Sequence, residues 1–175
     1  GNERGVSVAI RERERVRKVD RKTMSLSARN KDEPPTKQQF WNAAGVEGKF
    51  DVVKKCIEEY GFDVDLRDPG ENDTALIKSA YWARFEICEY LLSKGADIDA
   101  VDNSMGFSAI HFAAYRGTFN HIRIVKLLLE KGARLDVKSR TDPNWPDVKA
   151  RTPLDAAKQK GNKHIISLLE EAGAQ

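Results

Sequence analysis

The histidines and acids that could support catalysis are few and are not spaced for it. The chain has three histidines, His111, His121 and His164, and none has a nucleophile at a fixed spacing that would make a catalytic triad. Residues 63–68, which read DVDLRD, resemble the start of a calcium-binding loop. Such a loop needs an oxygen ligand at its fifth position and glycine at its sixth, where Arg67 and Asp68 stand. We therefore expect no enzymatic activity, no metal and no cofactor, and we interpret these acids as solvated loop residues.

The two cysteines, Cys56 and Cys88, could form a disulfide, bind a metal or provide a reactive thiol. Both fall at positions where a predicted helix faces inward, however, and a free cysteine behaves as a small buried hydrophobe. Unpaired cysteines are also typical of reducing compartments. We interpret both as reduced core residues and expect an intracellular protein, in the cytoplasm or the nucleus.

The composition gives no sign of a membrane or secreted protein. No apolar run approaches the roughly 18 residues that a membrane-spanning helix needs, so we expect no membrane insertion. The chain begins with Gly1 and without an apolar signal region, which is compatible with a segment of a longer polypeptide and does not indicate secretion.

After about residue 38, the chain consists of four related copies of one pattern. The clearest copy reads FSAIHFAAYRG at 107–117 and IVKLLLEKGA at 124–133, and the others contain FWNAAGVEG from 40, TALIKSAYWA from 74 and TPLDAAKQKG from 152. The first part predicts a short helix with a small-residue face. The second part places Val125, Leu128 and Leu129 at the i, i+3, i+4 spacing of a helix that packs on one side. A helical hairpin of this size cannot bury its apolar face alone, so the copies are predicted to stack as an α-solenoid.

The pattern resembles the ankyrin repeat, whose opening Thr-Pro-Leu-His survives here as Thr152-Pro153-Leu154 and as Ile110-His111. The resemblance implies an all-α solenoid of four helix-turn-helix repeats linked by β-hairpin-like loops. The repeat domain is expected at 38–175, with repeats at about 38–71, 72–105, 106–149 and 150–175, preceded by a basic N-terminal arm over 1–37. The resemblance also implies that His111 makes a structural hydrogen bond to a neighbouring repeat.

Short signals mark the helix ends and the inward faces of the copies. Hydroxyl residues stand just before three first helices, where each can accept a backbone N–H and contribute about 1 kcal/mol: Thr74, Ser108 and Thr152. Glycines follow three second helices, where a left-handed cap is expected: Gly95, Gly132 and Gly173. The second-helix residues predicted to point inward are Cys88, Leu91, Leu92, Val125, Leu128, Ile166, Leu168 and Leu169.

The third repeat is longer than the others. The equivalent positions Gln39, Thr74, Ser108 and Thr152 are separated by 35, 34 and 44 residues, against about 33 in the family. The extra residues lie in two places, 118–121 and 138–151. Because insertions in a repeat array map to loops, often on a binding face, we predict that both segments are irregular parts of the surface.

The resemblance also implies where a partner binds, because ankyrin-like proteins use their hairpin tips and the concave face made by their first helices. In the two central repeats, the positions expected to project toward that face hold Tyr81, Trp82, Tyr115 and Arg116. Tyrosine, tryptophan and arginine are enriched in binding hot spots. The alternative is that Trp82 only packs against Arg116 or a neighbouring loop. Trp145, in the long insertion, is a second candidate anchor or a plug that pins its own loop.

The formal net charge of +3 hides an asymmetry, because residues 1–39 carry +5 and residues 40–175 carry −2. The arm contains a dense basic run made of Arg11, Arg13, Arg15, Arg17, Lys18, Arg21 and Lys22. Such a run is typical of a solvated arm, but it could also bind an acidic protein or nucleic acid. The arm has no aromatic residue for base stacking, which argues against sequence-specific nucleic-acid binding.

We therefore predict a non-enzymatic protein–protein interaction module, a scaffold or assembly subunit that binds another protein and is monomeric or part of a hetero-complex. The alternative is a regulatory or chaperone-like module whose basic arm engages an acidic protein or nucleic acid. An enzyme is the least favoured class, because it would need groups from another chain.

Overall fold

The computed structural model describes residues 34–140 and 150–174, and the chain divides into two units, Gly1–Gln39 and Phe40–Gln175. Two groups of predicted binding residues lie outside the described part, so the hypotheses about them stay predictions. They are Trp145 in the long insertion and Arg11, Arg13, Arg15, Arg17, Lys18, Arg21 and Lys22 in the arm.

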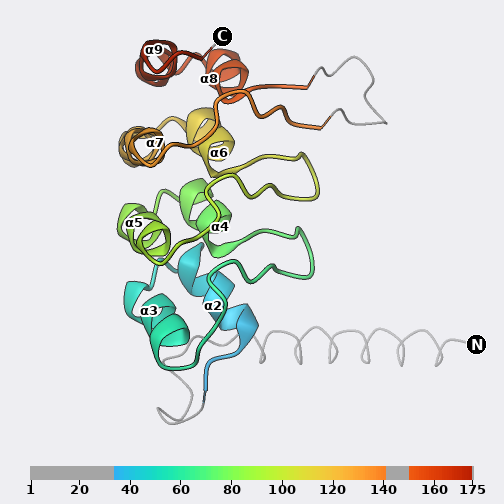
Figure 1. The fold of residues 1–175 in the computed structure, drawn as a ribbon, viewed down its shortest axis with the longest axis vertical. Helices are drawn as coiled ribbons and strands as arrows, with labels where there is room; N and C mark the ends of the chain where they lie inside the picture. The colour runs from blue at the N-terminus through green and yellow to red at the C-terminus, as the bar shows by residue number, and fades with distance from the viewer. Residues whose placement is uncertain (1–33, 141–149, 175) are drawn as a thin grey trace, which may run out of the picture. The chain divides into compact units, whose positions relative to one another are not determined.

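The described residues form four helix pairs. The first helices of the pairs are α2 (Lys37–Ala44), α4 (Ala75–Tyr81), α6 (Ala109–Arg116) and α8 (Pro153–Lys160). The second helices are α3 (Phe50–Glu58), α5 (Phe85–Ser93), α7 (Phe119–Glu130) and α9 (Lys163–Glu171). Figure 1 shows the pairs stacked in chain order, with first helices in one layer and second helices in the other. This arrangement is the predicted all-α solenoid.

The loops that link the pairs extend to one side of the helices, where they lie one above another (Figure 1). Each turns back on itself, but the described residues contain little regular β pairing. It is limited to one isolated antiparallel bridge, between Val101 and Ser108. The loops are therefore hairpin-like in course.

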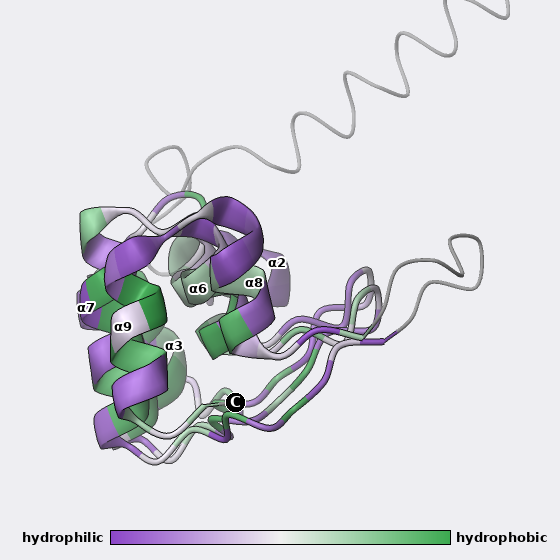
Figure 2. Cartoon of the chain, turned by 90° about the horizontal axis from the view of Figure 1, so that it is seen from above, coloured by the Kyte–Doolittle hydropathy of each residue, from purple (hydrophilic) through white to green (hydrophobic). Residues whose placement is uncertain are grey.

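The apolar core lies between the two layers of helices. Figure 2 looks along the stack and shows hydrophobic segments where the layers face each other. Leu91, Leu128 and Leu169 are fully buried, as predicted. In α9, Ile166 is half-buried and packs against the core, but the prediction is wrong for Leu168, which is half-buried and is not part of that cluster, and Ile165 is fully buried instead. A residue four positions before Leu169 lies on the same face of the helix, and this is Ile165.

Two of the three predicted caps at the starts of the first helices are present, whereas Ser108 makes no side-chain cap hydrogen bond and its Oγ instead bonds His111 Nδ1 at 2.9 Å. The Oγ1 of Thr74 accepts the N–H of Ile77 at 3.3 Å, and the Oγ1 of Thr152 accepts the N–H of Asp155 at 3.2 Å. Asp155 in turn accepts the N–H of Thr152 at 2.9 Å, which completes a capping box. The glycines after α5, α7 and α9 have positive φ angles, as predicted.

The first helices end in carbonyl groups that are capped by the following helix pair. Arg84 donates to two carbonyls just after α2, at 2.9 and 2.6 Å. Asn162 donates to two carbonyls at the end of α6, the shorter bond being 2.6 Å. The Nε2 of His121 donates to the carbonyl of Tyr81, at the end of α4, at 3.2 Å. Because the last carbonyls of a helix have no partner within it, these side chains both satisfy them and tie successive pairs together.

Residues 119–121 are helical and Thr118 is the N-cap of their helix, so the prediction of an irregular loop at 118–121 is wrong. Helix α7 begins at Phe119 and has 12 residues, against nine in α5 and nine in α9. The three added residues make almost one helical turn. A capping box between Thr118 and His121 lies at the start of this turn. The added turn brings His121 to the end of α4. The second insertion is described only at its ends, where Ser139 and Arg151 share two hydrogen bonds of 2.8 Å.

Candidate interaction surface

A groove lies between the second and third helix pairs, bounded by the loop before α4, by α4, by the loop before α6 and by α6. It encloses about 300 Å³. We call it the central groove, and its lining residues are Glu71, Asp73, Ile77, Lys78, Tyr81, Trp82, Asp102, Ser104, Met105 and Phe112. The lining thus combines aromatic and acidic side chains.

One wall of the groove is aromatic and rests on a small apolar cluster. The ring of Tyr81 meets those of Trp82 and Phe112 edge-on, with centroid distances of 5.3 and 5.5 Å. Phe112 is buried in a cluster with Ile77 and Phe107, whereas Trp82 leaves 41% of its surface exposed. Edge-on pairs are a favourable arrangement of aromatic rings. The wall therefore presents an exposed indole on a well-packed support.

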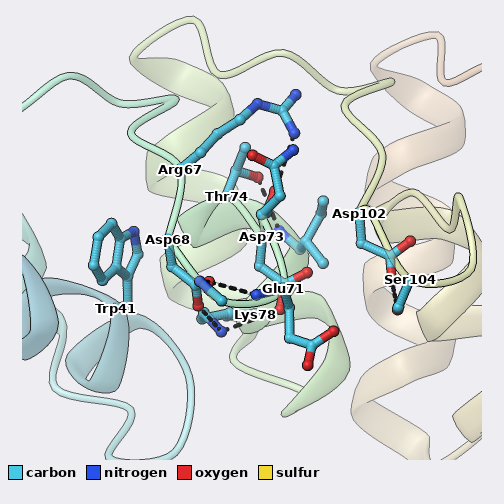
Figure 3. A network of polar contacts seen from close by, with 12 residues as sticks. Trp41, Arg67, Asp68, Glu71, Asp73, Thr74, Lys78, Asp102 and Ser104 are labelled. Atoms are coloured by element: carbon cyan, nitrogen blue, oxygen red, sulfur yellow. Dashed lines mark hydrogen bonds and ion pairs between the residues drawn. The ribbon is translucent and has the colours of Figure 1, made fainter.

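Lys78 organises the acids on the other side of the groove (Figure 3). Its Nζ lies 2.6 Å from Asp68 Oδ2 and 3.1 Å from Asp73 Oδ2. Burial disfavours the charge of Lys78, but the hydrogen bond with Asp68 and the charge of Asp73 outweigh it and raise the pKa of Lys78. In Asp68 the effect of burial is likewise outweighed by Lys78, so the pKa of this carboxyl is lowered. Asp68 is thus mostly covered and paired, and our interpretation of it as a solvated loop residue is wrong.

Asp73 differs from Asp68 because its two oxygens have different surroundings. Oδ2 faces Lys78, whereas Oδ1 is buried and has no hydrogen-bond partner among the described residues. Burial outweighs the attraction of Lys78 here, and the pKa of Asp73 is raised. The groove therefore contains one carboxylate oxygen that the described part of the chain leaves unsatisfied.

Asp102 fixes the loop that forms the opposite side of the groove. It is 2% exposed, and it accepts hydrogen bonds from Ser104 Oγ at 2.6 Å and from the N–H groups of Met105 and Phe107 at 3.2 and 2.7 Å. Glu71 is exposed, and its carboxylate makes no ion pair or hydrogen bond within residues 34–140 and 150–174. Figure 3 shows Glu71 pointing away from Trp41, on the side of its loop where Asp102 and Ser104 lie.

Hydrogen bonds between neighbouring loops hold the walls of the groove together. The N–H of Asn103 donates to the carbonyl of Glu71 at 3.0 Å, and the N–H of Arg140 donates to the carbonyl of Met105 at 2.7 Å. Arg67 also donates to the carbonyl of Val101 at 2.9 Å. These bonds tie the loop before α4 to the loop before α6, and the loop before α6 to the segment that follows α7.

A comparison with known protein families agrees with this architecture of stacked helix pairs joined by projecting loops. The family model described as Ankyrin repeats (3 copies) matches residues 40–141. The chain belongs to the ankyrin repeat family. Ankyrin repeats generally mediate protein–protein interactions, and the fold is typically a non-enzymatic module.

Curated proteins with similar ankyrin segments are much longer than this chain. Glycerophosphocholine phosphodiesterase GDE1 of Eremothecium gossypii is 31% identical over 86 residues, which are 49% of this chain and 6% of that protein. The human transient receptor potential cation channel subfamily A member 1 is 33% identical over 99 residues, 55% of this chain and 8% of the channel. Ankyrin repeat protein nuc-2 of Neurospora crassa is 26% identical over 160 residues, 74% of this chain and 14% of that protein. The chain therefore spans a small part of the relatives that it matches.

His111, at the fourth position of the ankyrin tetrapeptide, has the structural role that the resemblance implies. Its Nε2 lies 3.1 Å from the carbonyl of Val137, in the loop after α7, and 3.2 Å from that of Arg151, in the following repeat. Since carbonyls only accept, Nε2 carries the proton, and Nδ1 accepts from Ser108. Burial outweighs these carbonyl contacts and lowers the pKa of His111. His111 therefore makes these hydrogen bonds as a neutral imidazole.

His121 repeats the arrangement of His111, which sequence reasoning did not find. Its Nδ1 lies 2.6 Å from Thr118 Oγ1, its Nε2 donates to Tyr81, and burial lowers its pKa. The signal in the sequence is a hydroxyl residue three positions before a histidine, found at 118–121 as well as at 108–111. The same pairing of a hydroxyl residue with a histidine therefore starts a first helix, α6, and a second helix, α7.

The structure brings three of the four described candidates for partner binding together, namely Tyr81, Trp82 and Arg116. Tyr81 and Trp82 line the central groove, whereas Tyr115 does not line it and contacts Lys160 of the next helix pair. Arg116 stacks on the ring of Tyr81, with its Cζ 4.5 Å from the centroid, and not on Trp82. Trp82 is also close to the preceding repeat, since a Cβ added at Gly45 would lie 3.1 Å from its Cδ1. Binding by these residues stays a prediction.

The cysteines are free and buried, as predicted. Burial raises the pKa of Cys56 to about 11 and that of Cys88 to about 12, so neither thiol readily becomes a thiolate. Within the described ranges, no group of three or more His, Cys, Asp or Glu side chains is placed to hold a metal ion. None of the helices in that part of the chain is long and apolar enough to cross a membrane.

Proposed function

We propose that this chain is a non-enzymatic scaffold or assembly subunit that binds a partner protein through the central groove, with Tyr81 and Trp82 as its principal contacts. The observation that carries the proposal is Trp82, which is 41% exposed beside a groove of about 300 Å³ whose walls are bonded together. An aromatic side chain already held by its neighbours loses little rotamer freedom on binding. Arg116, which stacks on Tyr81, and Tyr115, which contacts Lys160, are proposed as flanking contacts.

The proposal is tested by comparing two exposed aromatic side chains. Trp82→Ala should weaken partner binding by at least about 2 kcal/mol, roughly 30-fold, as expected for a hot-spot residue. Phe119→Ala is the control, because Phe119 is 77% exposed and does not line the groove. It should change affinity less than about twofold.

The partner is obtained by affinity purification with the intact chain and with Trp82→Ala as paired baits, and it is then titrated calorimetrically. Circular dichroism shows whether each variant keeps its helices. If Trp82→Ala and Tyr81→Ala are folded and bind the partner as tightly as the parent, binding does not use the central groove and the proposal fails.

An intracellular location is part of the same proposal. It is supported by two free cysteines that lie unpaired in the core. Fractionation of the source cell, with the protein recovered from the cytoplasm or the nucleus, is the expected result.

A further inference from the structure

The carboxylates of the central groove outnumber its cations. Its lining contains Glu71, Asp73 and Asp102 but a single cation, Lys78. The Nζ of Lys78 is already bonded to Asp73 Oδ2 and to Asp68, which does not line the groove. A partner segment that enters the groove therefore meets an excess of negative charge.

The unused acceptors are specific atoms. Asp102 has a bonded donor at each oxygen, so it offers little to a partner. Asp73 Oδ1 is buried without a hydrogen bond among the described residues, and the Glu71 carboxylate is exposed and unpaired there. An unsatisfied buried acceptor is costly, and a positively charged donor is the strongest partner it can gain.

Apolar surface lies beside these acceptors. Trp82 and Met105, which are 41% and 45% exposed, both line the groove. Lysine and arginine carry methylene stems that pack on apolar side chains while the charged end stays hydrogen-bonded. A cation over an indole face gains a further electrostatic attraction.

We propose, on the basis of the function proposed above, that the central groove selects partner segments by one lysine or arginine side chain. Its charged end pairs with the exposed Glu71 carboxylate and is attracted by the charge of Asp73, and its stem lies on Trp82 and Met105. An acidic segment would be repelled, and a wholly apolar segment would cover the exposed Glu71 carboxylate without giving it a donor.

The test is selection of a displayed library of random linear peptides on the full 175-residue chain, with removal of those that also bind Trp82→Ala. The peptides that depend on Trp82 should share a lysine or arginine at one aligned position. Replacing that residue by norleucine or citrulline, which keep the shape and remove the charge, should weaken binding about tenfold.

The acceptors are tested with Glu71→Gln and Asp73→Asn. Each should reduce affinity for the cationic peptide and have much less effect on the affinity for its neutral analogue, which identifies the charge contact itself. Glu71→Gln also guards against a folding artefact, because Glu71 is exposed and its side chain forms no ion pair in the described part of the chain, whereas Asp73 bonds Lys78. Glu86→Gln is the matched control, since Glu86 is exposed and does not line the groove.

The outcomes separate this inference from the proposed function. Peptides that depend on Trp82 but show no preference for a cation, or lose less than about twofold when it is neutralised, would overturn the inference and leave groove binding in place. A selection that gives only peptides indifferent to Trp82 would overturn both.

Discussion

Ala83 occupies a backbone position that the other three helix pairs give to glycine. Gly48, Gly117 and Gly161 stand at the equivalent place between the two helices of their pairs, with φ angles of 63°, 67° and 68°. Ala83 adopts the same left-handed conformation, with φ of 59°. An L-residue with a Cβ pays for this conformation in steric strain, and glycine does not.

The expected effect of Ala83→Gly is a modest gain in stability. The strain of a left-handed L-residue is roughly 1 to 2 kcal/mol, and the greater freedom of glycine in the unfolded chain offsets about 0.4 to 1 kcal/mol of this. The net gain in the free energy of unfolding is therefore about 0.5 to 1 kcal/mol. With a urea slope of about 2 kcal/mol per molar, the midpoint should rise by roughly 0.3 to 0.5 M.

Gly161→Ala is the reciprocal change. A Cβ at Gly161 would meet no atom within 4 Å, so the substitution introduces backbone strain without a clash. It should lower the midpoint by a similar amount, and the double variant should melt close to the parent, because the two sites belong to different repeats and add independently. Gly48 would be a poorer choice, since a Cβ there would lie 2.6 Å from Arg84 Nε.

Urea unfolding followed by circular dichroism measures all three variants. If Ala83→Gly lowers the midpoint while Gly161→Ala also lowers it, the left-handed strain at Ala83 is not the controlling term. A contact of the methyl group would then outweigh it, and the reasoning from backbone geometry would be refuted.

Three further predictions concern the core. Leu128→Ala should cost roughly 2 to 5 kcal/mol because it leaves a cavity at a fully buried site, and a loss below about 1 kcal/mol in urea melts would contradict the packing. Burial lowers the pKa of His121 from 6.5, so folding favours the neutral ring; this contribution is present above about pH 6.5 and is lost as the pH falls through the folded-state pKa. His121→Gln should therefore flatten the fall in stability between about pH 7.5 and pH 5, and equal slopes in the parent and the variant would count against this role. Since burial raises the pKa of Cys88 to about 12, a thiol reagent at neutral pH should modify it only after unfolding, and rapid reaction of the native protein would show that the core opens.

The helix pairs, their caps and most of their core could be predicted from the sequence alone. Thr74 and Thr152 cap the helices that follow them, and Leu91 and Leu128 are fully buried. These features depend on residues within about one helical turn of each other, so a local pattern contains the information. The same reasoning could name Tyr81 and Trp82 as candidates, because their place in the repeat follows from the helix register.

The contacts between repeats could be found only from the tertiary structure. Arg84 caps a carbonyl 39 positions earlier in the chain, and Asn162 caps one 48 positions earlier. The helical form of 119–121, in a segment that we predicted as a loop, follows from the Thr118–His121 capping box and the bond of His121 to Tyr81, 40 positions away. The pairing of Lys78 with two acids, and the unsatisfied oxygen that remains in the groove, likewise depend on how the chain turns back on itself. Helix periodicity sets which face of an element points inward, but only the stacking of one repeat on the next decides which polar atoms meet.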